Sequence, residues 1–444
     1  MHKREKMKYY AHLFIFLPMC AFANQDCATM RHVPQHEMTL IEIVNMGLCR
    51  NPHTAAAYAA LQSARFTKNA AHSYYLPTFT AHGGANRSHT QHDDWQYSAS
   101  LSASYLIFDF GKRESDFAQM LSTYRAAGFD YDETIQNYVY SVIGAYYALL
   151  NMDADVKSAQ SALTVAQTAK DTADKKYKAG AVAKADVYKA DTTLASSQLA
   201  LERAKNNREI AKGTLLNTLS FPANENITIK DMPVVFGSDA ESEHIDNLIK
   251  IAREKRPDLL KAKSQTNAAW HKRNAAFLKG MPSISVNGNA DTTDKTVGGM
   301  FDNMSVKVKG EFGVSVSMPI FTGFYNFYTA RSANADYESM KYNEQNVSND
   351  VTMDVFTAYQ NYKTARTVLK QSETLLKSAT ESERVTAGMY KVGRATMLDW
   401  QTAQSELVDA QKQNNSAKYD LFIKRAAVAL AIGDIKTGLK ENGK

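Results

Sequence analysis

The stretch YKAGAVAKADV at residues 177–187 decides the fold, because a related stretch, YKVGRATMLDW, returns at residues 390–400. The Tyr, Gly and Asp positions that the two stretches share are each separated by 213 residues. The same separation relates Ile107 to Ile320, and a separation of 205 residues relates Pro77 to Pro282. The chain therefore contains an internal duplication, and its second copy has gained eight residues between positions 282 and 320.

Each quoted stretch predicts the tip of a helical hairpin. Gly180 and Gly393 can adopt the left-handed conformation that ends a helix, and the next helix begins just before Asp186 or Asp399. An Asp in the first turn of a helix is most often a capping residue, so a structural role and a functional role both stay open at this point.

The segments around these tips predict long helices. No proline occurs between residues 113 and 177, so an uninterrupted helix there would be roughly 95 Å long. Helices of this length exceed a globular core and must pack along one another. Small and aliphatic residues at alternating spacings of three and four predict antiparallel coiled coils, with a seam that includes Val187, Ala190, Leu194, Ser197 and Leu201.

Four segments alternate apolar and polar residues with the period of a β-strand. The clearest are WQYSASLSASYLIF at 95–108 and SVKVKGEFGVSVSMPI at 305–320, and weaker alternation begins at 79 and 284. One apolar face is typical of a strand that faces lipid, and also of a soluble sheet with one wet face. Four strands cannot satisfy all their backbone groups in lipid, so a membrane barrel would need several chains.

The N-terminus predicts export. Residues 1–23 combine a basic start, an apolar run and Ala21-Phe22-Ala23, which predicts a signal peptide cleaved after Ala23; lipidation of Cys20 is the alternative. Removing residues 1–23 leaves 48 Lys and Arg against 45 Asp and Glu, a net charge of +3 that does not indicate a nucleic-acid partner. Cys27 and Cys49 remain, and a disulfide between them and two unpaired thiols are both open.

The sequence gives no sign of catalysis. His82, His89 and His92 lie near Asp93 and Asp94, but an exposed polar loop explains this composition without a metal. No phosphate-binding glycine loop, nucleophile elbow or zinc-ligand spacing occurs. We therefore expect no enzyme activity, no cofactor and no bound metal.

The chain resembles the TolC-type outer-membrane factors. The resemblance covers nearly all of the exported chain and is carried by TLIEIVNMGLCRNP, LIFDFG, YKAGAVAKADV, EKRPDLL, MPIFTG, YKVGRATMLDW and ALAIGDI. It implies an α+β fold in which long coiled-coil helical hairpins form a periplasmic tunnel. It also implies a homotrimer in which each chain gives four strands to a 12-stranded transmembrane β-barrel in the outer membrane of a Gram-negative bacterium.

The resemblance also implies a function. Such a protein is the passive exit duct of a tripartite efflux pump or of a type I secretion system. Its partners would be a periplasmic adaptor, a proton-driven or ATP-driven inner-membrane pump and outer-membrane lipid. The alternative is a periplasmic coiled-coil scaffold that conducts nothing.

The family's tip residues map onto this sequence, except that Arg394 lies one position away from the family's tip arginine. Tyr390 and Arg394 are expected to hydrogen-bond or pair with Asp186 or Asp399. The resemblance assigns a periplasmic gate to Asp186, Asp399, Thr402, Tyr390 and Arg394, and adaptor docking to Gly180, Ala181, Lys184, Gly393 and Met397. Thr402 stands where the family pattern has a second acidic residue, so the carboxylate ring is expected to be single. Three Asp399 side chains in a narrow pore would favour cations.

The duplication predicts the following organisation of the chain. After the signal peptide, a first repeat spans residues 24–220 and a second repeat spans 244–433. Each repeat contains a helix, a β-hairpin and a long helical hairpin. The β-hairpins are placed at 78–108 and 283–320, the helical hairpins at 110–220 and 323–433, a linker at 221–243 and a C-terminal tail at 434–444.

Overall fold

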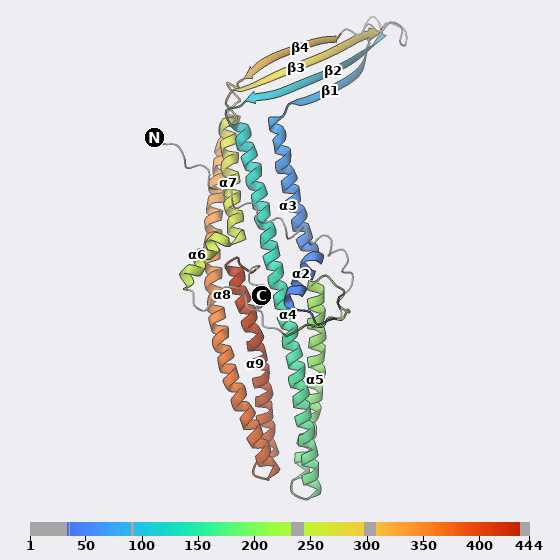
Figure 1. Cartoon of the computed structure of the whole chain (residues 1–444), viewed down its shortest axis with the longest axis vertical. Helices are drawn as coiled ribbons and strands as arrows, with labels where there is room; N and C mark the ends of the chain where they lie inside the picture. The colour runs from blue at the N-terminus through green and yellow to red at the C-terminus, as the bar shows by residue number, and fades with distance from the viewer. Residues whose placement is uncertain (1–32, 35, 90–92, 232–243, 297–307, 436–444) are drawn as a thin grey trace. The chain divides into compact units, whose positions relative to one another are not determined.

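The computed structural model describes residues 33–34, 36–89, 93–231, 244–296 and 308–435 (Figure 1). The predicted signal peptide, Cys27 and His92 lie outside these residues. The described chain divides into two compact units, and each unit takes segments from both copies of the duplication. The first unit contains the described residues within 1–57, 131–257 and 349–444, and the second contains those within 58–130 and 258–348. The boundaries of the predicted repeats therefore describe the sequence, whereas the compact units combine the repeats.

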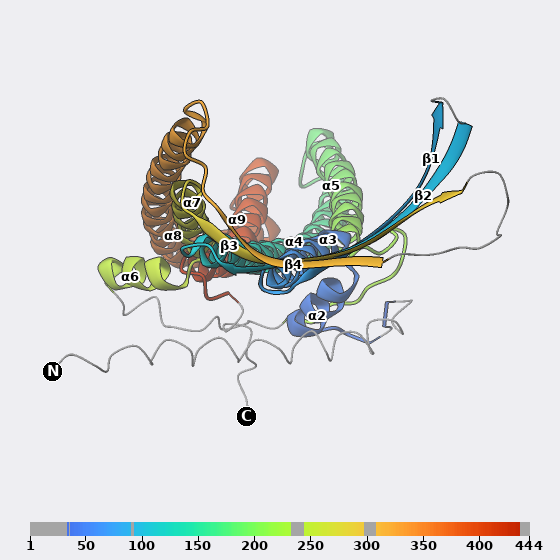
Figure 2. The same cartoon turned by 90° about the horizontal axis from the view of Figure 1, so that it is seen from above.

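The second unit contains one antiparallel sheet of four strands, in the order β1-β2-β3-β4 (Figures 1 and 2). The strands are β1 (Thr78–His89), β2 (Asp93–Phe108), β3 (Ser283–Thr296) and β4 (Val308–Ser317). The connection from β3 to β4 covers residues 297–307, and that from β1 to β2 covers residues 90–92. The eight additional residues of the second copy therefore fall in the connection from β3 to β4.

The fourth strand is shorter than predicted. The alternating pattern places the end of the second β-hairpin at residue 320, whereas β4 ends at Ser317. Pro319 has no backbone N–H to donate to the sheet, and its ring restricts the conformation of the residue before it. In the first copy Leu106 stands at the position of Pro319, and β2 continues to Phe108 with an irregular register between Leu106 and Phe108.

The sheet has one polar and one apolar face. On the polar face Ser104 Oγ donates to Asn287 Oδ1 at 2.8 Å, and Asn287 Nδ2 donates to Ser315 Oγ at 2.8 Å, which links three strands. The other face exposes large apolar side chains of β1, β2 and β4, whereas the apolar residues of β3 are half-buried. The exposed group contains Phe79, Tyr97, Leu101, Tyr105, Ile107, Val308, Phe312, Val314 and Val316.

Two long helical hairpins account for most of the chain. The first joins α4 (Lys112–Lys178) to α5 (Lys184–Thr218), and the second joins α8 (Tyr325–Lys391) to α9 (Met397–Ala431). Helices α4 and α8 are each 67 residues long without a break, as the absence of proline predicts. In the part of the chain that the structure describes, no helix is long and apolar enough to cross a membrane.

The shorter helices repeat the same break in both copies. Helix α2 (Leu40–Arg50) is followed by α3 (Pro52–Ala70) and the 3₁₀ helix η1 (Ala71–Tyr75), and α6 (Ile245–Lys255) is followed by α7 (Pro257–Leu278). Pro52 and Pro257 each begin a helix, where the missing N–H costs nothing. The residue before each proline is extended, with ψ of 120° at Asn51 and at Arg256, because proline disfavours the helical conformation in its predecessor.

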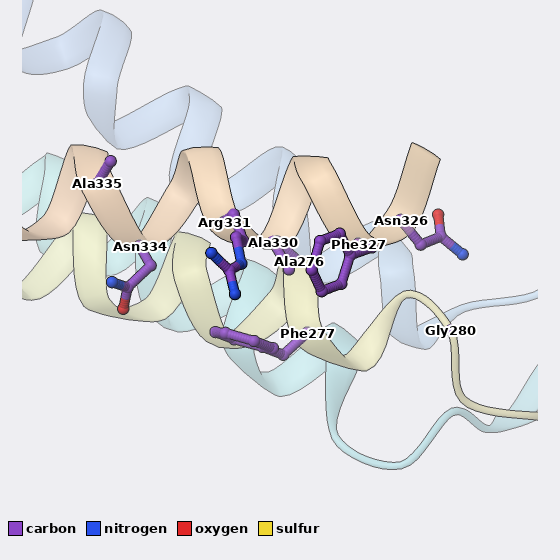
Figure 3. A pocket seen from close by; sticks show the side chains of 9 residues that line it. All are labelled: Ala276, Phe277, Gly280, Asn326, Phe327, Ala330, Arg331, Asn334 and Ala335. Carbon is purple, nitrogen blue, oxygen red and sulfur yellow. The ribbon is translucent and has the colours of Figure 1, made fainter. Parts of the chain in front are cut away.

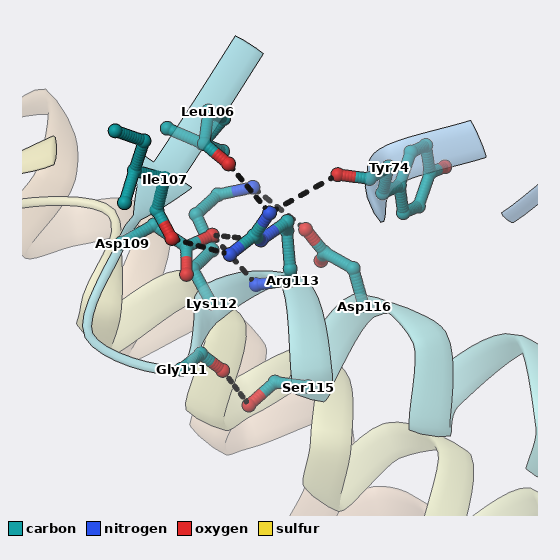
Figure 4. A network of polar contacts seen from close by, with 9 residues as sticks. All are labelled: Tyr74, Leu106, Ile107, Asp109, Gly111, Lys112, Arg113, Ser115 and Asp116. Atoms are coloured by element: carbon teal, nitrogen blue, oxygen red, sulfur yellow. Dashed lines mark hydrogen bonds and ion pairs between the residues drawn. The ribbon is translucent and has the colours of Figure 1, made fainter. Parts of the chain in front are cut away.

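The junction between β2 and α4 is held by Arg113 (Figure 4). Its guanidinium donates to the backbone oxygens of Leu106 at 2.7 Å, Ile107 at 3.0 Å and Tyr74 at 3.4 Å. Its backbone N–H donates to Asp109 Oδ2 at 2.8 Å. Asp109 is 5% exposed, so this carboxylate depends on Arg113 for its charge partner.

The second copy builds the corresponding junction differently. Thr322 and Asn326 stand at the positions of Asp109 and Arg113, and the backbone N–H of Asn326 donates to Thr322 Oγ1 at 3.4 Å. Both junctions contain two successive residues with positive φ, namely Phe110 and Gly111 in the first and Gly323 and Phe324 in the second. The same backbone turn is therefore kept, and only the first copy stabilises it with a buried ion pair.

The core of the first unit gathers where several helices of that unit meet. Tyr146 and Tyr147 of α4 are fully buried there, among residues from α2 and from the C-terminal ends of α5 and α9. The predicted linker takes part, because the Tyr146 hydroxyl donates to the backbone oxygen of Lys230, and the backbone N–H of Met38 donates to Thr228 O at 2.9 Å. Cys49, in α2, is disulfide-bonded; its predicted partner Cys27 lies outside the described residues.

Close packing at Gly47 of α2 predicts a measurable effect of one added methyl group. A Cβ atom at residue 47 would lie 2.2 Å from the Tyr138 hydroxyl oxygen and 2.7 Å from a methyl carbon of Leu219. The Tyr138 hydroxyl donates to Thr218 O at 3.0 Å, so moving it breaks a buried hydrogen bond. We expect Gly47→Ala to destabilise the protein by about 1–3 kcal/mol, measured by thermal unfolding in detergent with far-UV circular dichroism.

Gly144 of α4 provides the matched control for this substitution. A Cβ atom there meets nothing within 4 Å in this chain, so Gly144→Ala should raise stability by about 0.5–1 kcal/mol through helix propensity. Equal melting temperatures for the two variants would show that the packing around Gly47 is looser than described.

Candidate functional site

The two hairpin tips have the same backbone turn, as the repeated sequence predicts. Gly180 has φ of 74° and Gly393 has φ of 80°, which an L side chain adopts only with strain. Ala181 N donates to Lys176 O at 2.8 Å and Gly180 N to Tyr177 O at 2.9 Å. This pair of hydrogen bonds is the Schellman ending of a helix, and α8 ends in the same way at Gly393 and Arg394.

The helices that leave the two tips begin differently. At α9 the hydroxyl of Thr396 accepts from Asp399 N at 3.2 Å, and Asp399 Oδ2 accepts from Thr396 N at 2.8 Å, which completes a capping box. At α5 the corresponding residue is Ala183, which offers no side-chain hydrogen bond. Asp186 therefore occupies the position of Asp399 without a capping partner.

The two aspartates differ in their electrostatics for the same reason. The backbone N–H and the hydroxyl of Thr396 stabilise the charged form of Asp399 and hold its pKa below the usual range of an aspartate. The charge of Asp186 instead acts on Tyr390, because burial and then this neighbouring charge raise the pKa of the tyrosine. Asp186 therefore lies close enough to Tyr390 to influence its hydroxyl.

A cluster of buried side chains joins the two hairpins near their tips. This tip cluster consists of Ala169, Ala173, Ala190, Tyr390, Met397 and Trp400. The rings of Tyr390 and Trp400 lie 5.3 Å apart between centroids, and Trp400 Nε1 donates to Glu383 Oε1 at 2.8 Å. The alanines of α4 and α5 leave room for these larger side chains of α8 and α9.

The duplicated tyrosines have opposite environments. Tyr390 is 2% exposed, whereas its counterpart Tyr177 is 43% exposed. The buried hydroxyl of Tyr390 has no hydrogen-bond partner among the described residues. A buried hydroxyl without a partner costs free energy. A rearrangement that gives the Tyr390 hydroxyl a hydrogen-bond partner would therefore be favourable.

Polar contacts also connect the hairpins, and no sequence pattern predicts them. Lys176 donates to the backbone oxygen of Tyr390. Gln401 Nε2 donates to Lys189 O at 2.9 Å, Gln404 Nε2 to Ala162 O at 3.1 Å, and Asn415 Nδ2 to Asp155 Oδ1 at 3.3 Å. The heptad pattern predicts the seam inside each hairpin, but these residues lie on the flank that meets the other hairpin.

The structure places the predicted docking residues unevenly. Gly180, Ala181, Lys184 and Gly393 are exposed at the tips. Met397 is only 1% exposed, because its side chain belongs to the tip cluster, whereas its neighbour Leu398 is 57% exposed. A docking role for Met397 thus requires that the cluster opens, and Leu398 is the accessible apolar side chain at this turn.

The remaining predicted gate residues also have defined surroundings. Thr402 Oγ1 donates to Leu398 O at 3.0 Å within its own helix. Arg394 is exposed and makes no side-chain hydrogen bond or ion pair in the part of the chain that the structure describes. The structure thus brings Asp186 near Tyr390, whereas the pairing predicted for Arg394 is not formed within the described chain. Gate and docking roles remain predictions.

The second unit contains a groove between α7 and α8, with a volume of about 740 Å³ (Figure 3). Its walls are mainly apolar, and its single charged lining residue is Arg331, whose guanidinium lies 5.0 Å from the ring centroid of Phe327. No lining residue can act as a general base. Among the described residues, no group of three or more His, Cys, Asp or Glu side chains could hold a metal ion.

Comparison with known proteins identifies the same architecture elsewhere. The family model described as outer membrane efflux protein matches residues 43–219 and 248–434, one match for each repeat. Protein CyaE of Bordetella pertussis is 20% identical over 308 residues, which are 68% of this chain and 64% of that protein, less than two thirds of its length. The outer membrane protein TolC of Vibrio cholerae is 22% identical over 335 residues, 71% of this chain and 74% of that protein.

A solved structure shows that the fold itself is shared. The outer membrane protein VceC of Vibrio cholerae superposes with a TM-score of 0.76 at 19% identity, covering 89% of this chain and 96% of that chain. The sheet and the paired helical hairpins described above are therefore the fold that this outer membrane protein also has.

The unequal caps of the two tips predict opposite effects of two substitutions. Thr396→Ala removes the hydroxyl that caps α9, and Ala183→Thr supplies the same hydroxyl to α5. We expect amide hydrogen exchange in the first turn of α9 to become about fivefold faster in the first variant. Exchange in the first turn of α5 should become slower in the second variant. Unchanged exchange in both turns would contradict the assignment of the cap.

The pH dependence of this effect follows from Asp399. Because its pKa is lowered in the folded chain, its contribution is fully present above the pKa of an unfolded aspartate, about 4. The contribution is lost as the pH falls through the folded pKa. The difference in exchange between wild type and Thr396→Ala should thus be constant near neutral pH and decrease only in strong acid.

Proposed function

The chain belongs to the outer membrane efflux protein family, and from this premise we propose that three copies form a passive duct across the outer membrane. Membership of this family places the chain in the outer membrane and makes it a channel component rather than an enzyme. The proposal adds the trimer, a periplasmic tunnel built by the hairpins, a gate at the tips and a docking surface for a partner.

The single observation that best supports the trimer is the open amphipathic sheet. Among the described residues, its edge strands β1 and β4 each pair on one side only, and unpaired strand edges are not tolerated in lipid. Pairing β4 of one chain with β1 of the next closes a barrel without an edge, and three chains supply 12 strands. The exposed apolar face would then face lipid and the Ser and Asn face the interior.

The tips supply the parts of a gate. In a trimer, three copies of Asp399 and three of Asp186 would lie around one axis, where like charges repel and cations are attracted. Tyr390 supplies a buried hydroxyl whose pKa is raised by burial and by the charge of Asp186, and Arg394 supplies an exposed positive charge at its own tip. A hydrogen bond from Tyr390 to Asp186 would hold the closed state, and Arg394 would pair with an aspartate of a neighbouring chain. Thr402, whose hydroxyl is used within its helix, adds no second ring of charge.

The exposed backbone of the tips suits a periplasmic adaptor. Gly180, Ala181 and Gly393 present no bulky side chain, so a partner can approach the backbone closely. Lys184 and Leu398 supply a charge and an apolar contact beside them. The adaptor would connect the duct to a proton-driven efflux pump or to an ATP-driven exporter, which determines the cargo.

Purification of the full-length protein in detergent, followed by planar-bilayer recording, tests the duct. We expect a trimer by light scattering and an ion conductance that prefers cations. Asp399→Asn keeps an oxygen that can cap α9 and removes the charge, so it should reduce cation selectivity, measured as the reversal potential in a salt gradient. Asp399→Ala removes both and should also loosen the closed state.

The outcomes of this experiment separate two functions. If both the wild type and Asp399→Ala are water-soluble and conduct no ions, the chain is a non-conducting periplasmic scaffold instead. A conducting trimer whose selectivity is unchanged in Asp399→Asn would retain the duct and remove Asp399 from the gate.

Photo-crosslinking in living cells tests the docking surface. A photoreactive amino acid at Lys184 or Leu398, both exposed, should capture an adaptor protein that mass spectrometry identifies. The same amino acid at Met397 is the matched control, because that side chain is buried and should capture little. Equal capture from Met397 and Leu398 would show that the tip cluster is open in the assembled system, and no capture from any of the three would argue against docking at the tips.

A further inference from the structure

We propose that Lys176 is a positioning residue of the gate, which fixes Tyr390 and holds the two hairpins of one chain together at their tips. This inference rests on the proposed duct and names a residue to which the sequence comparison of the tips assigns no role. It concerns a contact within one chain, between the end of α4 and the end of α8.

The contact combines two interactions of one ammonium group. Lys176 Nζ donates to the backbone oxygen of Tyr390 and lies 4.4 Å from the centroid of the Tyr390 ring. Tyr390 belongs to the last turn of α8, where backbone oxygens lack a helical partner and carry partial negative charge. The same oxygen also accepts from Gly393 N at 3.1 Å. The lysine therefore completes the C-terminal cap of a helix from the opposite hairpin.

The position of Tyr390 depends on this contact. Its ring lies against Trp400 at 5.3 Å, and the Lys176 ammonium lies over it. Separating the hairpins would break a charged hydrogen bond, remove the cation from the ring and expose a side chain that is 2% exposed. With the ring held by its backbone and its face, the hydroxyl stays buried without a hydrogen-bond partner among the described residues.

The duplication provides an internal comparison. The counterpart of Lys176 in the second repeat is Met389, which cannot donate a hydrogen bond, and the tyrosine that follows Lys176 is exposed. A cation at the end of α4 thus coincides with a buried tyrosine at the end of α8, and the reverse arrangement is absent from the described tips. Among the described residues, the neighbouring Lys175 is exposed and does not take part in the tip cluster, so charge alone does not define the position.

The experiment replaces Lys176 by methionine, the residue found at the corresponding position of the second repeat, Met389. Lys176→Met keeps an unbranched, flexible side chain and removes the donor, Lys176→Arg keeps a donor and a cation, and Lys175→Met is the matched control. In planar bilayers we expect Lys176→Met to raise the time-averaged conductance of the full-length protein about tenfold. The reason is that the closed state loses a charged hydrogen bond in each chain. Lys176→Arg should restore most of the closed behaviour, and Lys175→Met should match wild type.

A distance measurement makes the inference independent of conductance. Spin labels on unnatural amino acids at the exposed positions Lys178 and Val392 report the separation of the two tips. Lys176→Met should broaden this distribution and shift it to longer distances, with melting temperature and helical content unchanged. An unchanged distribution together with unchanged conductance would overturn the role of Lys176.

The two measurements also distinguish the failure of each proposal. If no variant conducts but the tip distance responds to Lys176→Met, the duct fails and the contact stands as a purely structural one, so that the gating role is wrong. If wild type conducts and Lys176→Met leaves both readouts unchanged, the duct stands and the positioning role is wrong. A loss of tip closure in Lys175→Met as well would show that general tip charge, rather than this contact, controls the separation.

Discussion

Close packing of small side chains along the helical hairpins is the constraint on which the rest of the chain depends. Helices of 67 residues cannot surround a compact core, so each must be stabilised along its whole length by a neighbour. Alanine makes this possible because it allows helix axes to approach closely. Buried alanines recur on all four long helices, including Ala159, Ala166, Ala169, Ala173, Ala190, Ala379, Ala403, Ala410 and Ala417. Where larger residues such as Trp400 enter, alanines of the other hairpin face them.

Duplication supplied two copies of one design, and the structure shows where they have diverged. Both copies keep the left-handed glycine of the tip, the proline that starts a helix and the positive-φ pair after the strands. They differ in the residues around these turns: Ala183 against Thr396 at the caps, Lys176 against Met389 beside the tyrosines, and Arg113 against Asn326 at the strand–helix junction. Backbone geometry is thus maintained while side-chain chemistry has become specific to each copy.

The sequence was sufficient for the elements and insufficient for their contacts. The absence of proline, the period of two in the strands and the repeated glycines predicted α4, α8, β2 and both tips, because these signals are local. Alternation does not predict the end of β4 at Ser317, because the pattern continues past the point where Pro319 removes a donor. Lys176, Gln404 and the burial of Met397 could not be predicted, since each depends on which helix flanks meet across more than 200 residues of chain.

The unequal tips have a consequence for stoichiometry. A chain that carries two copies of one hairpin approximates two subunits, so a ring of three chains would resemble a ring of six. In such a ring, the capped turn at Thr396 and the uncapped turn at Ala183 would break the apparent sixfold symmetry into alternating positions. A partner that binds every tip would therefore have to bind two unlike surfaces. It could do so through two different kinds of contact, or through identical copies bound in two different environments.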